Sequence, residues 1–180
     1  MSGSGWVHSS VPYVRPRGEG ERDAWSEETA ARGRRGAQRI VHAREVPASA
    51  EVAALLGVDE GAAVVERRRL IYLDEHATEV TDSYYPVRIA RGTPLAGTAK
   101  IPGGAVTLLA SLGHVGQRVR EEVSARLPTA AEQEWLDLGA GDPVLCLTRV
   151  TLDSQEQPFQ VDMSVFPAAS QRLRYELGID

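Results

Sequence analysis

The sequence has few of the features that mark secreted or membrane-spanning proteins. It contains one cysteine, Cys146, so no disulfide can form within the chain, and its place in an apolar run is typical of a buried thiol. No run approaches the roughly 20 apolar residues of a transmembrane helix. The opening MSGSGWVHSS lacks the basic-then-apolar pattern of a secretion signal. These absences predict a soluble, cytoplasmic protein with no membrane partner.

Signatures of catalysis, metals and cofactors are missing as well. The histidines His8, His42, His76 and His114 do not have metal-ligand spacing. There is no G-x-S-x-G elbow, no phosphate-binding G-x-x-x-x-G-K and no dinucleotide fingerprint, and no pair of carboxylates stands out for acid–base chemistry. We therefore expect no catalytic residue, no metal and no cofactor.

The charge is nearly balanced, with 20 Lys and Arg against 25 Asp and Glu, a net charge of −5 and a pI near 5.4. The chain as a whole has no electrostatic footprint for nucleic acid. At 180 residues and 42% apolar content it can furnish the core of one compact domain. Residues 1–37 are poor in aliphatic side chains and rich in glycine, proline and mixed charge, which predicts a partly ordered arm preceding a domain at 38–180.

An internal repeat with a spacing of about 80 residues organises that domain. The first copy spans 38–86 and the second 117–167, and both end in an aromatic residue followed by proline. The matched pairs are Pro47 with Pro128, Glu51 with Glu132, Leu55 with Leu136, Val64 with Val144, Arg69 with Arg149 and Leu70 with Val150.

Each copy predicts a strand, a helix and a hairpin in that order. The strand stops at a proline, and the helix after it has an N-cap, Ser49 in the first copy and a Thr129–Glu132 capping box in the second. Between the copies, Gly103-Gly104 precedes an apolar helix that ends at Gly113. The predicted strands cover 39–46, 64–73, 77–85, 118–127, 144–152 and 159–166.

Two such units can share one sheet, because a single helix cannot cover the apolar face of each hairpin. The predicted fold class is α+β, with a pseudo-twofold, mostly antiparallel sheet, packed helices, and ligand space between sheet and helices.

Consecutive arginines on a predicted strand are the main candidates for ligand binding. Alternation along the strand places Arg67 and Arg69 on one face and Arg68 on the other. Two guanidinium groups on one face favour a carboxylate or phosphate; the alternative is a solvated face whose alkyl stems pack on neighbours. Arg149, the repeat mate of Arg69, favours a structural role for at least one inward arginine in each half.

Further candidates lie on the return strand and at the glycine pair. Thr81, Ser83 and Tyr85 share one face of the strand, and polar groups facing a core need partners, of which a ligand is one. Gly104 at a helix start could let backbone amides approach an anion, although a glycine pair is also an ordinary loop.

From about Gln38 to Leu177 the chain resembles the UTRA domain, the effector-binding C-terminal part of HutC-type regulators in the GntR family. The stretches that carry the resemblance are VPASAEVAALLGVDEGAAVVERRRLIYL, TDSYYPVRIARGTPLA, VSARLPTAAEQEWLDLGAGDPVLCLTRV and FQVDMSVFPAASQRLRYEL.

The resemblance implies a chorismate-lyase-like fold, a homodimer and an allosteric pocket for a small anionic metabolite. It implies that Arg67 or Arg69 holds the anionic group, that the helix start at Gly104 assists, and that Thr81 and Gln160 face the pocket. In such repressors, effector binding re-orients N-terminal winged-helix domains and lowers operator affinity.

The sequence departs from that family in three places. No winged helix precedes the domain, so DNA would be contacted only through a domain absent from this chain. Family members that bind sugar phosphates tend to have a hydroxyl residue in place of Gly104 and a glutamate in place of Thr81, which argues against a phosphosugar. The tail PAASQRLRYEL lacks an arginine–aspartate pair common in the family, which leaves the pocket lid unassigned.

Two other functions stay open on the sequence alone. A stand-alone enzyme on the same fold would consume a small carboxylated substrate instead of sensing a ligand. A dimerisation module would pair with full-length repressors and bind no ligand of its own.

Overall fold

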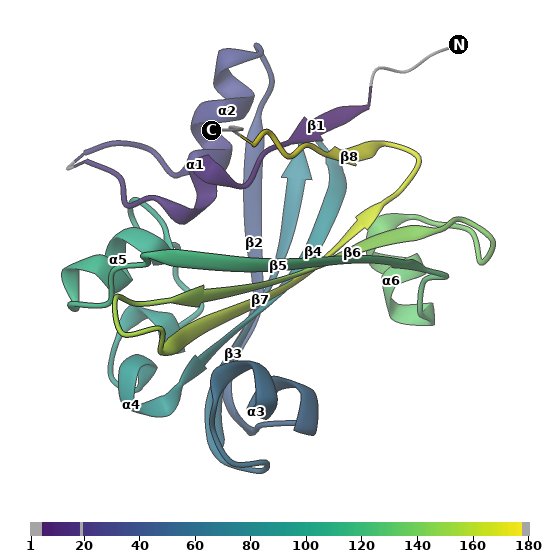
Figure 1. Cartoon of the computed structure of the whole chain (residues 1–180). Coiled ribbons are helices and arrows are strands. Elements are labelled where there is room, and N and C mark those ends of the chain that lie inside the picture. The colour runs from purple at the N-terminus through teal and green to yellow at the C-terminus, as the bar shows by residue number, and fades with distance from the viewer. Residues whose placement is uncertain (1–4, 19, 178–180) are drawn as a thin grey trace.

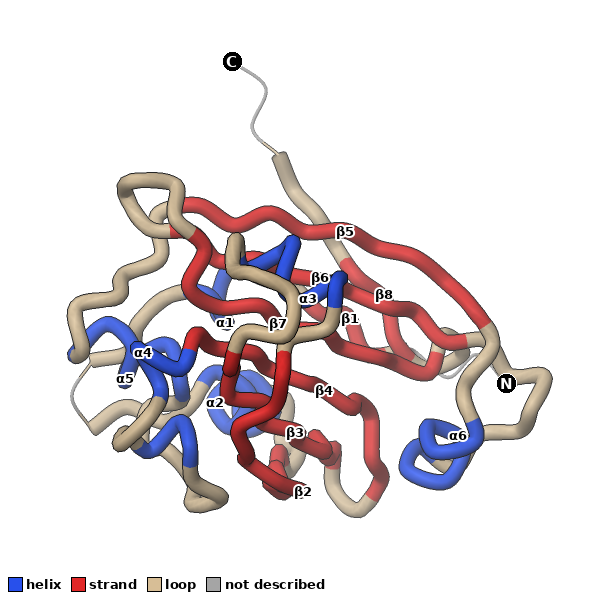
Figure 2. Tube along the Cα trace, turned by 90° about the horizontal axis from the view of Figure 1, so that it is seen from below, coloured by secondary structure: helices blue, strands red, loops and turns tan. Residues whose placement is uncertain are grey.

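The computed structural model describes residues 5–18 and 20–177, and its centre is an antiparallel sheet of six strands. The strand order is β2-β3-β4-β7-β6-β5, which Figure 2 shows from one edge of the sheet to the other. All six predicted strands are confirmed within a few residues of their expected bounds. They are β2 (Gly36–Pro47), β3 (Ala63–Leu73), β4 (His76–Pro86), β5 (Arg118–Arg126), β6 (Val144–Leu152) and β7 (Pro158–Pro167).

The two halves of the sheet meet where β4 pairs with β7. Asp82 lies opposite Met163, and these two residues are also repeat mates 81 positions apart. A residue that pairs with its own mate lies on the axis relating the two copies. The pairing therefore confirms the predicted pseudo-twofold arrangement.

Two short capped helices follow the outer strands. The side chain of Ser49 accepts a hydrogen bond at the start of α3 (Ala50–Leu56), and the helix ends at Gly57 in the left-handed region with φ 64°. The predicted capping box of Thr129 and Glu132 begins α6 (Ala130–Leu136). Both helix starts were predicted from the sequence and are confirmed.

The repeat alignment was one residue out of register in the helices. Ser49 and Thr129 are equivalent caps, and they are 80 positions apart. Glu132 is the third residue after its cap, whereas Glu51 is only the second, so the structural counterpart of Glu132 is Val52. Chemical similarity between the two glutamates misled the alignment, because only Glu132 completes a capping box.

The sheet buries a different set of side chains on each face. On one face, Leu56 of α3 packs with Val64 and Val161, and Leu136 of α6 packs with Leu70. On the other face, α4 (Val87–Ala90), the 3-10 helix η1 (Pro94–Ala96) and α5 (Ala105–Ser111) cover an apolar cluster at one end. Figure 1 shows α3 below the sheet and α1 and α2 above it.

The arm predicted at 1–37 packs onto the second face in the part that is described. It forms β1 (Trp6–His8), α1 (Val11–Val14) and α2 (Ala24–Ala31), and β1 runs parallel to β8 (Gln171–Leu173). The rings of Trp6 and Trp25 are 5.1 Å apart in an edge-on arrangement, and Trp25 Nε1 donates a 2.8 Å hydrogen bond to the carbonyl of Tyr72. None of the helices among the described residues is long and apolar enough to cross a membrane.

The seating of α2 depends on a glycine. A Cβ at Gly36 would lie 2.5 Å from Thr29 Oγ1 and 2.8 Å from Trp25 Cδ1. We expect Gly36→Ala to lower the free energy of unfolding by about 1–3 kcal/mol, because the helix must move to relieve the overlap. Urea unfolding measures the loss, and Gly141→Ala, which meets nothing within 4 Å, is the control. Equal stability of the two variants would contradict this packing.

The capping box also predicts a pH dependence. Arg126 hydrogen-bonds to Glu132 at 2.6 and 2.7 Å and, as the largest influence, lowers the pKa of that carboxyl. A lowered folded-state pKa stabilises the fold above the unfolded value of about 4.3, and the effect is lost as the pH falls through the folded value. We expect Glu132→Gln to lower the free energy of unfolding by about 1 kcal/mol at pH 7. The difference in unfolding free energy between this variant and the wild type should shrink as the pH falls through and below about 4.3. The exposed Glu134→Gln should show neither the loss at pH 7 nor the pH dependence. A gap that is constant from pH 7 to 3 would contradict the assignment.

Candidate functional site

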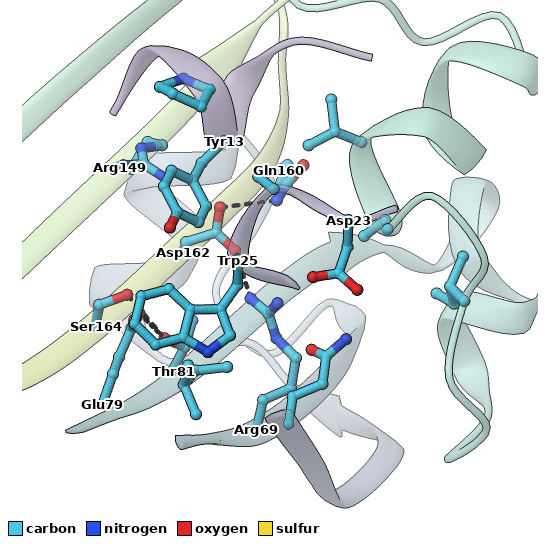
Figure 3. Close-up of a pocket in the computed structure, with 18 of the residues that line it drawn as sticks. Tyr13, Asp23, Trp25, Arg69, Glu79, Thr81, Arg149, Gln160, Asp162 and Ser164 are labelled. Carbon is cyan, nitrogen blue, oxygen red and sulfur yellow. Dashed lines mark hydrogen bonds and ion pairs between the residues drawn. The ribbon is translucent and has the colours of Figure 1, made fainter. Parts of the chain in front are cut away.

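A cavity of about 120 Å³ lies between the polar part of the sheet and the arm (Figure 3). A single water needs about 10–15 Å³ on this measure, so the cavity has room for a small ligand. Its floor comes from β3, β4, β6 and β7, and one wall from Ile101 and residues 103–106. Its roof comes from arm residues, namely His8, Pro12, Tyr13, Arg15, Arg17, Asp23, Ala24 and Trp25. The floor residues are Arg67, Arg69, Ile71, Glu79, Thr81, Leu147, Arg149, Gln160, Asp162, Ser164 and Phe166.

Strand alternation explains why these side chains share the floor. Alternate residues of β3 and β4 line the cavity, namely Arg67, Arg69 and Ile71 of β3 with Glu79 and Thr81 of β4. The prediction that Arg67 and Arg69 share one face of the strand is confirmed. Arg68 points to the opposite face, where its guanidinium binds both oxygens of Asp82 at 2.6 Å. Strand β3 therefore places Arg67 and Arg69 in the cavity and Arg68 on the face of the sheet that α6 covers.

Arg67 links strand β3 to the loop at 97–99. Its Nε donates to the carbonyl of Gly97 at 3.2 Å and its Nη2 to the carbonyl of Ala99 at 2.7 Å. The side chain is almost fully covered, at 3% exposure. Burial, with a smaller contribution from neighbouring Arg69, lowers the pKa of the guanidinium. Both of these hydrogen bonds go to the loop before α5.

Arg69 is less completely paired. Its Nη2 donates to Ser83 Oγ at 3.1 Å and lies 3.8 Å from Asp162 Oδ1, at the outer limit of an ion pair. Its Nε is buried and has no hydrogen-bond partner among the described residues. A buried donor without a partner costs about 1–3 kcal/mol. A ligand acceptor at this position would remove that cost.

Arg149, the repeat mate of Arg69, has partners on both the sheet and the arm. Its Nε donates to Glu121 at 2.6 Å and its Nη2 to Ser10 of the arm at 3.0 Å. Burial alone would raise the pKa of Glu121, but Arg149 and the hydrogen bonds from Ser10 and Tyr175 outweigh it and hold that pKa below its ordinary value. Arg149 therefore ties the arm to the sheet.

The roof brings aromatic and acidic groups over the floor. His8 lies between Tyr13 and Phe166, with ring centroids 4.4 and 5.8 Å away, and burial lowers its pKa, which favours the neutral ring. Asp23 caps α2 through Ser26 and meets Lys100 at 3.0 Å. Burial would raise the pKa of Asp23, but these partners lower it overall.

Six of the eight predicted site residues line the cavity: Arg67, Arg69, Thr81, Gly104, Arg149 and Gln160. Ser83 is buried beneath the floor, where it donates to Asp162 and accepts from Arg69. Tyr85 is 1% exposed and belongs to the apolar cluster under α4 and α5, where burial raises its pKa to about 12. Contact with an effector stays a prediction for all eight residues. Ser83 and Tyr85 contact other side chains and do not line the cavity.

Gly104 adopts a positive φ of 87° just before α5. A side chain there would be strained whatever the space around it, which gives the glycine a conformational reason as well as a place in the cavity wall. The helix it precedes has only seven residues.

Sequence reasoning missed the roof. Eight lining residues belong to the arm, including Tyr13, Arg17 and Trp25. The only available signal was that aromatic residues interrupt an otherwise polar segment. Among residues 5–18 and 20–177, no group of three or more His, Cys, Asp or Glu side chains could hold a metal ion.

Comparison with known proteins identifies the domain. The family model described as the UTRA domain matches residues 31–172. The chain belongs to the UTRA domain family. The HTH-type transcriptional regulator GgaR of Escherichia coli K12 is 30% identical over 144 residues, 80% of this chain and 56% of the relative. An HTH-type transcriptional regulator of Streptomyces coelicolor is 37% identical over 109 residues, 59% of this chain and 40% of the relative.

This UTRA domain spans little more than half the length of the GgaR relatives it matches. Solved structures share its fold. The effector domain of PhnF from Mycobacterium smegmatis superposes with a TM-score of 0.74 at 22% identity, covering 92% of this chain and 99% of that one. The C-terminal domain of YurK from Bacillus subtilis has a TM-score of 0.69 at 18% identity, covering 76% and 92%. The predicted chorismate-lyase-like α+β fold is confirmed.

The two floor arginines should respond differently to the same substitution. Lysine keeps the charge but cannot reach two acceptors as a planar fork does. We expect Arg67→Lys to lower the free energy of unfolding by about 1–3 kcal/mol, because it leaves a buried carbonyl of Gly97 or Ala99 without its partner. Arg69→Lys should change stability by less than about 0.5 kcal/mol. Urea unfolding measures the free energy of unfolding of both variants. An equal loss of stability in the two would contradict a structural role for Arg67 that Arg69 does not share.

Proposed function

We propose that this UTRA domain senses a small anionic metabolite for a GntR-family transcription repressor of the HutC type. Residues 38–180 form the effector-binding unit and 1–37 the arm that leads into it. The protein acts as a homodimer and contacts DNA through winged-helix domains outside this chain. The family match and the regulators among its relatives support the sensing role.

The observation that carries the proposal is the buried Nε of Arg69 in the cavity floor, which has no hydrogen-bond partner in the part of the chain that the structure describes. A carboxylate or phosphate oxygen is the natural acceptor for a guanidinium, and such charge-assisted hydrogen bonds are roughly twice as strong as neutral ones. Gln160 and Thr81 lie on the same floor and supply polar contacts that orient a ligand.

The arm is the element through which the ligand acts. It roofs the cavity, and the structure ties it to the floor through Ser10 and Arg149 and to α5 through a 3.0 Å hydrogen bond from the Arg17 amide to Thr107. A ligand between floor and roof contacts both, so its affinity depends on where the arm lies. Coupling of this kind is typically about 1–3 kcal/mol.

The test is ligand binding by the chain itself, screened by melting temperature against carboxylic acids, sugar phosphates and aromatic acids. A ligand at 100 times its dissociation constant adds about 2.7 kcal/mol of stability. We expect Arg69→Gln to weaken binding of the selected anion by about 10-fold or more, because a hydrogen bond to a charged group is lost.

The matched control is Arg120→Gln on the exposed edge strand β5, which should leave affinity unchanged. Mass spectrometry follows the ligand during the assay. An intact ligand with Arg69-dependent affinity supports the sensor. Consumption of the ligand, or affinity indifferent to Arg69, would contradict it.

A further inference from the structure

Two hydrogen-bond chains cross the cavity floor between β4 and β7, and each ends on a carboxylate. In one, Arg69 donates to Ser83, Ser83 donates to Asp162, and Gln160 donates to the other oxygen of Asp162 at 2.7 Å. The other chain runs through Thr81, whose hydroxyl lies 2.8 Å from Ser164 Oγ and donates to Glu79 Oε1.

The two carboxylates differ in their charge partners. Asp162 lies within ion-pair distance of Arg69. Asp23, the third carboxylate lining the cavity, pairs with Lys100. Glu79 has no ion pair with any residue in the described ranges, and the one side-chain hydrogen bond it accepts there comes from a neutral hydroxyl. The neighbouring ring of His8 makes no ion pair with Glu79 among the described residues; burial lowers the pKa of His8, and the charge of Glu79 opposes that shift.

The repeat shows how this imbalance arises. Glu79 and Gln160 are mates 81 positions apart, so the first half carries a charge where the second carries an amide. Arg69 and Arg149 are also mates, but only Arg149 has a carboxylate at 2.6 Å. The first half therefore leaves one cation and one anion incompletely paired on the same floor, and the second half leaves neither.

The two groups are close enough for one small molecule to bridge them. Arg69 lies directly opposite Thr81 in the strand register, and Glu79 is two residues from Thr81 on the same face. The Cα atoms of such diagonal neighbours on adjacent strands are about 7–8 Å apart. Figure 3 shows Thr81 between them. Glu79 does not neutralise Arg69 directly, since no ion pair joins them within 4 Å.

The surroundings of Glu79 suit an ammonium group. Tyr13, Trp25 and Phe166 line the same cavity, and aromatic faces attract cations. A protonated amine bound here would form an ion pair with Glu79, and aromatic rings would replace part of its hydration shell.

The geometry points to a zwitterionic effector, with its anionic group on Arg69 and a protonated amine on Glu79. This assignment rests on the proposed sensing function and narrows its ligand class from anions in general to amino acids and related amine-bearing anions.

The test compares 5-aminopentanoate with pentanoate and pentylamine by calorimetric titration of the whole chain. We expect 5-aminopentanoate to bind at least about 10-fold more tightly than either relative, because each of those lacks one of the two charges. In Glu79→Gln the ratio between 5-aminopentanoate and pentanoate should fall to about one. Glu122→Gln, an exposed carboxylate on β5, should keep the wild-type ratio, and melting curves without ligand confirm that both variants fold.

The outcomes separate this inference from the proposed function. If pentanoate binds in an Arg69-dependent way and the amine adds nothing, the sensing function stands and the zwitterion assignment is wrong. A ratio that survives Glu79→Gln also overturns the assignment. If neither the three probes nor the wider anion panel binds in an Arg69-dependent way, the proposed function fails and this inference fails with it.

Discussion

The pairing of β4 with β7 is the constraint on which the rest of the molecule depends. It joins two strand–helix–hairpin copies along their pseudo-twofold axis at Asp82 and Met163. It also sets hydroxyl and carboxyl groups opposite one another, so that Thr81 meets Ser164 and Ser83 meets Asp162. Buried polar groups are stable only when they are hydrogen-bonded. A polar row at the centre of the sheet is thus satisfied internally and still presents charge to a cavity.

The two repeat copies together form the sheet, and the differences between them shape the cavity floor. Both copies supply an arginine to the floor. Arg149 binds Glu121 and the arm, whereas the Nε donor of Arg69 has no partner among the described residues. The arm covers only this face, while α3 and α6 seal the other one with apolar side chains. The fold therefore has apolar helix packing on one side of the sheet and a roofed polar cavity on the other.

Much of this could be predicted from residues that report local physics. The caps at Ser49 and Thr129, the six strands and the inward face of Arg67 and Arg69 follow from side-chain chemistry and period-two alternation, and all are confirmed. The roof could not be predicted, because the arm has no periodicity and is held by tertiary contacts such as Trp25 with the carbonyl of Tyr72. For the same reason, the different roles of Arg67 and Arg69 depend on the distant loop at 97–99.

We propose that a ligand binds between the sheet floor and the arm. Hydrogen exchange of the chain with and without a saturating ligand, selected by melting temperature, tests it most directly. We expect slower exchange in the arm peptides covering 6–31 together with those of β3, β4 and β7, because the ligand contacts roof and floor at once. Slower exchange confined to other elements, with the arm unchanged, would place the ligand elsewhere and contradict binding between the floor and the arm.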